Sequence, residues 1–198
     1  KQPAVYFDHS LALAETASTL VESHTFDYLL SQLPPQQKLA LLMEKLNSDV
    51  ATIFRQTAAY LFERELHQTF RQTGYLAQTD INRLFVSQMK AYLGPTIKTD
   101  PEANNWWIHW SHFRSFFYVY SYVYGFLTAQ ALKTKIKQEP SSIETIKTLL
   151  STGGTETPTE ALKRINLNPE KNTIWLKGLQ EFELKLKEAE HLAQTLKI

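Results

Sequence analysis

Apolar residues recur at helical spacing along most of the chain, and prolines, glycines and capping residues separate the periodic stretches. Glycine is scarce, at 6 of 198 residues, which also favours long helices. We therefore predict an all-α fold. The chain contains no internal repeat and no long linker rich in proline, glycine or serine. Residues 1–198 are accordingly expected to form a single helical domain.

Local signals predict where these helices begin and end. The first three expected helices run from a cap at Ser10 to about Leu33, from Gln36 to Gly74 with a break and a new N-cap at Asn47-Ser48-Asp49, and from a cap at Thr79-Asp80 to Gly94. Three more are expected towards the C-terminus: from Ser141-Ser142 to the residues before Gly153, over a short stretch after Pro158, and from Thr173 to Leu196. Residues 95–105 are expected to form a loop.

The stretch Leu11–Glu22 carries a carboxylate inside a helix that is apolar on almost every side. Such a helix is expected to be buried, and an isolated buried charge costs several kcal/mol or more. Glu15, Ser18 and Glu22 fall on one face of this helix. No lysine or arginine lies between Gln2 and Gln37, so a local ion pair is excluded. Glu15 is therefore predicted to be neutral, paired with a distant base or bound to a metal if it is buried. The alternative is a solvated carboxylate, which is the usual state of a single glutamate on a helix.

The segment FYVYSYVYG, residues 117–125, gives two conflicting signals. Its tyrosines alternate with valine and serine, and this period of two with β-branched and aromatic residues favours a strand. If the segment is helical, Tyr118 and Tyr122 share one face and Tyr120 and Tyr124 share another. The local pattern leaves both structures open.

Composition narrows the classes of protein to which the chain could belong. A net charge of +1 argues against an electrostatic binder of nucleic acid. The chain has no cysteine, which excludes disulfides and thiolate zinc sites and favours a reducing, cytoplasmic location. No apolar run reaches membrane-spanning length and no signal peptide is visible, so no membrane partner is expected. The chain opens with lysine in the middle of a pattern, and we expect it to be a piece of a longer protein.

Few segments carry recognisable catalytic chemistry. The chain lacks an HExxH zinc motif, a phosphate-binding glycine loop and a GxSxG nucleophile elbow. His109 and His112 are three residues apart and could chelate a metal if both lay on one helix. His112 also shortly precedes the row of tyrosines, and histidine with tyrosine suits hydrogen bonding to a developing oxyanion. The alternative is an aromatic core whose hydroxyl groups find partners elsewhere.

Four segments, in order along the chain, resemble the oligoendopeptidase F family of zinc metallopeptidases, which is related to thimet oligopeptidase. The segments are AETASTLVE at residues 14–22, ATIFRQTAAYLFERELH at 51–67, HFRSFFYVYSYVYGFLTA at 112–129 and, more weakly, STGGTETPTEALKRINLN at 151–168. The second and third are the specific ones. The resemblance implies a zincin-type helical peptidase domain, and it favours a helix that starts near Ser115 over a strand.

The resemblance also implies roles for individual residues. Glu15 matches the family's third zinc ligand, and Glu22 would support a ligand histidine or the zinc helix. His112 and Tyr118 match the pair that stabilises the oxyanion, with Tyr122 or Tyr124 contacting the backbone of an oligopeptide substrate. The sequence departs from the family at Val21, where an asparagine is usual.

The family's HExxH helix, with two histidine ligands and the catalytic base, is expected upstream of Lys1, in an N-terminal remainder of the same enzyme. The chain alone is therefore expected to bind Zn²⁺ weakly and to be inactive. The alternative is a non-catalytic helical interaction domain or a pseudo-peptidase, and the sequence upstream of Lys1 would distinguish the two.

Overall fold

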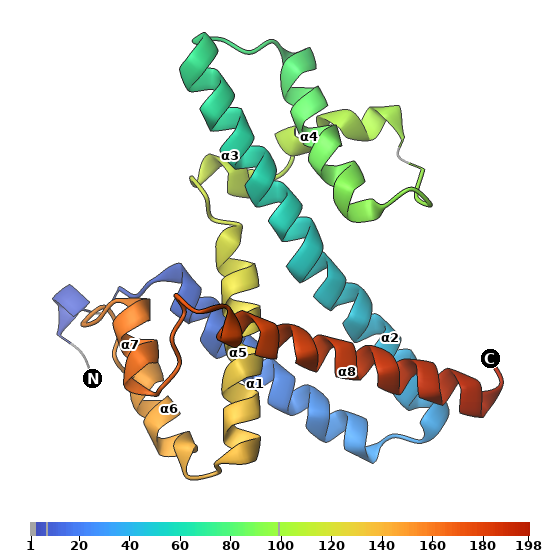
Figure 1. Cartoon of the computed structure of the whole chain (residues 1–198), viewed down its shortest axis with the longest axis vertical. Coiled ribbons are helices and arrows are strands. Elements are labelled where there is room, and N and C mark those ends of the chain that lie inside the picture. The colour runs from blue at the N-terminus through green and yellow to red at the C-terminus, as the bar shows by residue number, and fades with distance from the viewer. Residues whose placement is uncertain (1–2, 7, 99) are drawn as a thin grey trace. The chain divides into compact units, whose positions relative to one another are not determined.

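The computed structural model describes residues 3–6, 8–98 and 100–198, and these residues form helices without any strand (Figure 1). The described residues form two compact units. Unit 1 comprises Lys1–Asp49 and Tyr124–Ile198, and unit 2 comprises Val50–Val123. The all-α prediction is confirmed. The expectation of a single domain stays a prediction.

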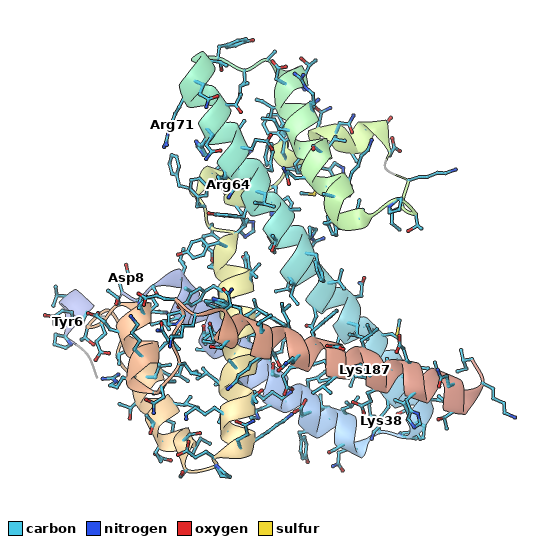
Figure 2. The ribbon with its side chains drawn as sticks, in the orientation of Figure 1. Tyr6, Asp8, Lys38, Arg64, Arg71 and Lys187 are labelled. Atoms are coloured by element: carbon cyan, nitrogen blue, oxygen red, sulfur yellow. The ribbon has the colours of Figure 1, made fainter. Side chains whose placement is uncertain are left out.

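Unit 1 is built from both ends of the chain. Its helices are α1 (Leu11–Gln32), α2 (Pro35–Val50), α5 (Tyr120–Gln138), α6 (Ser142–Leu150), α7 (Pro158–Arg164) and α8 (Asn172–Leu196), of which α2 and α5 each extend across a boundary with unit 2. A short 3₁₀ turn, η1 (Ala4–Tyr6), precedes α1. The backbone N–H of Gly154 donates to the carbonyl oxygen of Tyr6 at 2.8 Å, and Figure 2 shows Tyr6 and Asp8 at the end of the unit where α6 and α7 lie.

Helix α1 begins where its sequence predicts. Ser10 is the N-cap, and its hydroxyl oxygen accepts the Leu13 N–H at 3.3 Å. The prediction that this helix is buried all round is wrong, because the side chains of Leu11 and Val21 are exposed. One stripe is buried instead: Ala12, Leu13, Thr16, Leu20, Ser23, Phe26 and Leu30. The buried hydroxyl of Ser23 accepts from the Gln130 side chain at 2.8 Å, which ties α1 to α5.

Two hydrophobic clusters stabilise unit 1. The first lies between α5, α6, α7 and the start of α8, and includes Leu132, Ile146, Leu162 and Ile174. The second joins α1, α2 and α8 and is formed by Phe26, Leu30, Leu42, Leu46 and Ala189. Burial of these side chains is the main source of stability that such a helical unit has.

A chain of charges also crosses the interior of unit 1. Lys45 contacts both Glu22 and Asp49 at 2.8 Å, and Asp49 contacts Lys185 at 2.8 Å, which links α1, α2 and α8. Asp49 is 1% exposed. Burial lowers the pKa of Lys45, but the hydrogen bonds and charges of Asp49 and Glu22 outweigh this effect and raise that pKa above its ordinary value.

The break expected at Asn47-Ser48-Asp49 is wrong. Helix α2 continues into a π-helical turn, η2 (Ala51–Arg55), and then into α3 (Gln56–Thr73), and Val50, Arg55 and Gln56 all have helical dihedral angles. Asp49 does not cap a helix because its carboxylate binds Lys45 and Lys185.

Unit 2 is centred on α3 and α4 (Gln78–Leu93), which lie side by side (Figure 1). Gly74 ends α3 with φ 74°, a left-handed conformation that favours glycine. Helix α4 begins at Gln78 rather than at a Thr79-Asp80 cap, although the Asp80 carboxylate does accept the Ala77 N–H at 3.3 Å.

Two 3₁₀ segments, η3 (Pro101–Ile108) and η4 (Ser111–Arg114), follow α4. The expectation of a loop over residues 95–105 is therefore wrong for its second half. The indole N–H of Trp107 donates to Asn82 at 2.8 Å and so attaches η3 to α4. Phe62 of α3 packs edge-on against Phe85 and Phe113, with ring centroids 5.2 and 5.1 Å away, and forms the core of the unit.

Candidate active site

His112 lies in contact with two tyrosines of unit 2. Its Nε2 atom is hydrogen-bonded to the Tyr122 hydroxyl at 2.8 Å. The Tyr118 ring lies 5.1 Å from the imidazole, centroid to centroid, and 5.6 Å from the Tyr122 ring. All three side chains are half-buried. The structure thus brings together three of the residues that the sequence singled out.

The local backbone explains how these side chains meet. His112 is on η4, and Tyr122 is in the first turn of α5, which begins at Tyr120. The helix expected to start near Ser115 therefore starts five residues later. Phe116 and Phe117 have φ angles of 38° and 54°, which no right-handed helix can contain.

A hydrogen bond to Nε2 fixes how the imidazole is oriented. The other ring nitrogen, Nδ1, is buried and has no hydrogen-bond partner among the described residues. An imidazole with one nitrogen fixed by a tyrosine hydroxyl is a preoriented polar group, which is what stabilisation of a developing charge requires.

Tyr124 lies on a different face of α5 from Tyr122. Its ring packs against Trp175, with centroids 5.2 Å apart, at the edge of the first hydrophobic cluster of unit 1. Tyr120 is 43% exposed. The role of Tyr124 in binding substrate stays a prediction.

Glu15 of α1 is half-buried in unit 1. It faces Gly125 of α5 so closely that a β-carbon on Gly125 would lie 2.5 Å from the Glu15 β-carbon. Ser18 and Glu22, on the same face, are exposed, so the polar stripe is less buried than the sequence predicts. Glu22 has Lys45 as its partner, a base 23 residues away that local pattern could not identify.

A carboxylate is a suitable zinc ligand, but a protein zinc site needs three or four ligands. Within the described residues, no group of three or more histidine, aspartate or glutamate side chains could hold a metal. Glu15 could therefore supply one ligand of a site completed by groups from outside the described part of the chain. His109 and His112 do not share a helix, because His109 ends η3 and His112 lies on η4, so the spacing argument for a separate metal pair fails.

Glu63 of α3 is a site residue that sequence reasoning missed. It is 1% exposed, and its carboxylate accepts the Phe117 backbone N–H at 2.6 Å. Burial raises the pKa of this carboxyl above its ordinary value, and the Phe117 N–H and the His67 charge only partly offset that effect. The available signal was helical spacing, because Ala59 four residues before Glu63 and Leu66 three residues after it are both apolar, which places this acid on an apolar face.

An apolar cavity of about 870 Å³ lies within unit 2 and reaches His112. Val86, Met89 and Tyr92 of α4 form one part of its wall, and Trp106 and Trp110 form another. The Arg55 guanidinium lies 5.9 Å from the centre of the Trp110 ring. Apolar walls with a few polar groups are typical of ligand-binding pockets.

The chain belongs to peptidase family M3, whose family model matches residues 1–181. It is similar to oligopeptidase PepF of Bacillus subtilis (strain 168), at 30% identity over 99% of this chain and 30% of that protein. It is also similar to the chromosomal oligoendopeptidase F of Lactococcus lactis subsp. cremoris, at 29% identity over 98% of this chain and 32% of that protein.

Among solved structures, oligoendopeptidase-F from Enterococcus faecium matches with a TM-score of 0.84 and 30% identity, over 96% of this chain and 37% of that one. The chain thus spans about a third of the length of the relatives it matches. The resemblance drawn from the four sequence segments is confirmed. None of the helices that the structure describes is long and apolar enough to cross a bilayer.

Proposed function

We propose that this chain is part of a zinc metallo-oligopeptidase that hydrolyses peptide bonds in short peptides. The observation that carries the proposal is the 2.8 Å bond between His112 and Tyr122, with Tyr118 beside them, in a chain that belongs to family M3. Glu15 would be one zinc ligand. The other ligands and the catalytic base would come from the N-terminal remainder of the same protein.

In this proposal the chain's own residues bind and orient the substrate. The zinc ion, when bound, would supply a Lewis acid. Tyr118 would donate a hydrogen bond to the oxyanion that develops at the scissile carbonyl, and His112 would donate one through Nε2, the nitrogen that contacts Tyr122, since Nδ1 is buried. Each such bond is worth about 3 kcal/mol of transition-state stabilisation. Tyr122 would hold the His112 ring, in addition to the substrate contact that the resemblance implies.

The apolar cavity supports a preference for peptides with a large apolar side chain near the scissile bond. It reaches His112, so a substrate whose carbonyl lies at that imidazole could place a neighbouring side chain among Val86, Met89 and Trp110. A panel of peptides that differ at one position, from alanine to phenylalanine, would reveal this preference in kcat/KM.

The proposal is tested with the full-length protein that contains this segment. We expect it to cleave internally quenched oligopeptides, to lose activity in a chelator and to regain it with zinc. Glu15→Gln should abolish stoichiometric zinc in metal analysis, whereas Glu44→Gln, at an exposed position of α2, should not. The 198-residue chain alone should bind little zinc. Absence of zinc-dependent hydrolysis would favour a pseudo-peptidase or an interaction domain.

A further inference from the structure

The segment between His112 and Tyr122 contains a strained turn. Phe116 and Phe117, two bulky residues in succession, have φ angles of 38° and 54°. Left-handed backbone is unfavourable for such residues and persists only where the surrounding structure holds it in place. Another group must therefore hold Phe116 and Phe117 in this left-handed conformation.

Three side chains on one face of α3 contact the turn. The Glu63 carboxylate accepts the Phe117 N–H at 2.6 Å. The His67 ring lies 5.3 Å from the Phe117 ring and 6.0 Å from the Phe116 ring, and the Tyr60 ring lies 5.8 Å from Phe117. The spacing of 60, 63 and 67 places these residues on the same face of the helix. We call these three residues the α3 clamp.

The most specific contact of the clamp is the one that Glu63 makes. Its bond to Phe117 is short, at 2.6 Å, which is typical of the stronger protein hydrogen bonds. Glu63 is 1% exposed, and its second oxygen has no hydrogen-bond partner among the described residues. Among the described residues, this buried carboxylate has a strained backbone amide as its hydrogen-bond donor and His67 Nε2, at 4.0 Å, as a more distant ionic neighbour. Such an arrangement is poorly explained as a general contribution to packing.

The turn determines how His112 and the tyrosines face one another. His112 is fixed on η4, and Tyr118 directly follows Phe117, so a change of the Phe117 dihedral angles would redirect the chain that carries Tyr118 and Tyr122. We propose that Glu63 is a positioning residue, which holds the left-handed Phe116-Phe117 turn and thereby the contacts of His112 with Tyr118 and Tyr122. The effect of Glu63 on the rate of peptide hydrolysis rests on the proposed function.

The first experiment measures geometry without activity. In NMR spectra of the full-length protein, the Phe117 amide proton should be shifted strongly downfield, and His112 should show one fixed tautomer. Glu63→Ala should remove the downfield shift and the fixed tautomer. Glu63→Gln, which keeps an acceptor oxygen, should retain both with a smaller shift. Glu65→Gln is the matched control, because Glu65 is two residues further along α3 and accepts from Gln88 at 2.9 Å.

The second experiment measures turnover. Glu63→Ala should lower kcat at least tenfold and change KM less than threefold, and Glu63→Gln should restore most of the rate. If Glu63→Ala keeps the His112 tautomer and the rate, the proposal is wrong. If Glu63→Ala disturbs His112 but the unmodified protein hydrolyses no peptide, the proposed function fails while the positioning role stands.

Discussion

Gly125 and Glu15 are in contact where α5 crosses α1, and no side chain fits between them. A β-carbon built on Gly125 would lie 2.5 Å from the Glu15 β-carbon and 2.9 Å from the Thr16 backbone nitrogen. Two of the three atoms nearest to it are backbone, so α1 itself would have to move. The position of the proposed zinc ligand thus depends on the absence of a side chain on a neighbouring helix.

We predict that Gly125→Ala destabilises the protein by about 1–3 kcal/mol, because overpacking outweighs the gain of about 0.5–1 kcal/mol that alanine usually brings to a helix. Urea unfolding would measure the change. In the full-length protein the same variant should weaken zinc binding, because α1 is displaced at Glu15.

Gly178→Ala is the control for this variant. A β-carbon on Gly178 of α8 would lie 2.8 Å from the Leu127 carbonyl oxygen, so it tests a similarly tight approach to α5 that does not involve Glu15. Gly178→Ala should lower stability and leave zinc affinity unchanged. Equal zinc affinity for the two variants would contradict the link between Gly125 and the ligand.

The buried pair Asp49–Lys185 gives a second prediction. Lys185→Met should destabilise the protein by about 3 kcal/mol, because it leaves the Asp49 carboxylate buried with Lys45 as its remaining base. The double variant Asp49→Leu with Lys185→Met should recover part of this loss, because neither charge of the pair remains and Lys45 keeps Glu22 as its partner at 2.8 Å. Urea midpoints for the single and double variants form the required cycle.

Lys187→Met provides the comparison. Lys187, labelled in Figure 2, is on the same helix and pairs with Glu183 at 2.6 Å, but both side chains are mostly exposed. Such surface pairs contribute little, so the unfolding midpoint should not change. If Lys187→Met lowered the stability as much as Lys185→Met does, burial of the Asp49–Lys185 pair would not explain the effect of Lys185→Met.

Local sequence signals predicted the parts of the fold that depend on neighbouring residues. The Ser10 cap, the end of α3 at Gly74 and the start of α7 at Pro158 each follow from residue types within one helical turn. The break expected at Asp49 failed because the partner of this carboxylate, Lys185, is 136 residues away.

The same limit applies to the site. The resemblance identified His112, Tyr118 and Tyr122, which the structure brings together, but it placed the start of the following helix at Ser115. The helix begins at Tyr120 because Glu63, 54 residues before Phe117, holds the preceding turn. The burial of Glu15 was overestimated because Leu11 and Val21 are apolar but exposed, a common condition of surface residues.

The buried carboxyl of Glu63 predicts a pH dependence of stability. Its pKa is raised above the ordinary value of 4.5, so between pH 4.5 and the raised pKa the folded state binds more protons than the unfolded state. This group's contribution to stability is therefore greatest below pH about 4.5 and falls as the pH rises through the raised pKa. Above that pKa the contribution is constant.

Urea midpoints measured from pH about 4 to 8 would check this prediction. The stability of the unmodified protein relative to Glu63→Gln should decrease with rising pH, because glutamine does not titrate. The stability of the unmodified protein relative to Glu65→Gln should show no such decrease from Glu63, because both of these proteins keep the Glu63 carboxyl. If the stability of the unmodified protein relative to Glu63→Gln stayed constant or increased with pH, the raised pKa of Glu63 would be contradicted.

The two tyrosines that contact His112 are predicted to act differently in catalysis. In the full-length protein, Tyr118→Phe should lower kcat about 100-fold, the loss typical of one oxyanion donor, with KM changed less than about threefold. Tyr122→Phe removes the 2.8 Å bond to His112 Nε2 and should lower kcat less, about 10-fold, because the imidazole is no longer held but can still reach the carbonyl. Tyr120→Phe, exposed on the same helix, should leave both constants unchanged. If Tyr118→Phe retains kcat while Tyr122→Phe loses 100-fold, Tyr122 is the oxyanion donor, and the assignment of that role to Tyr118 is wrong.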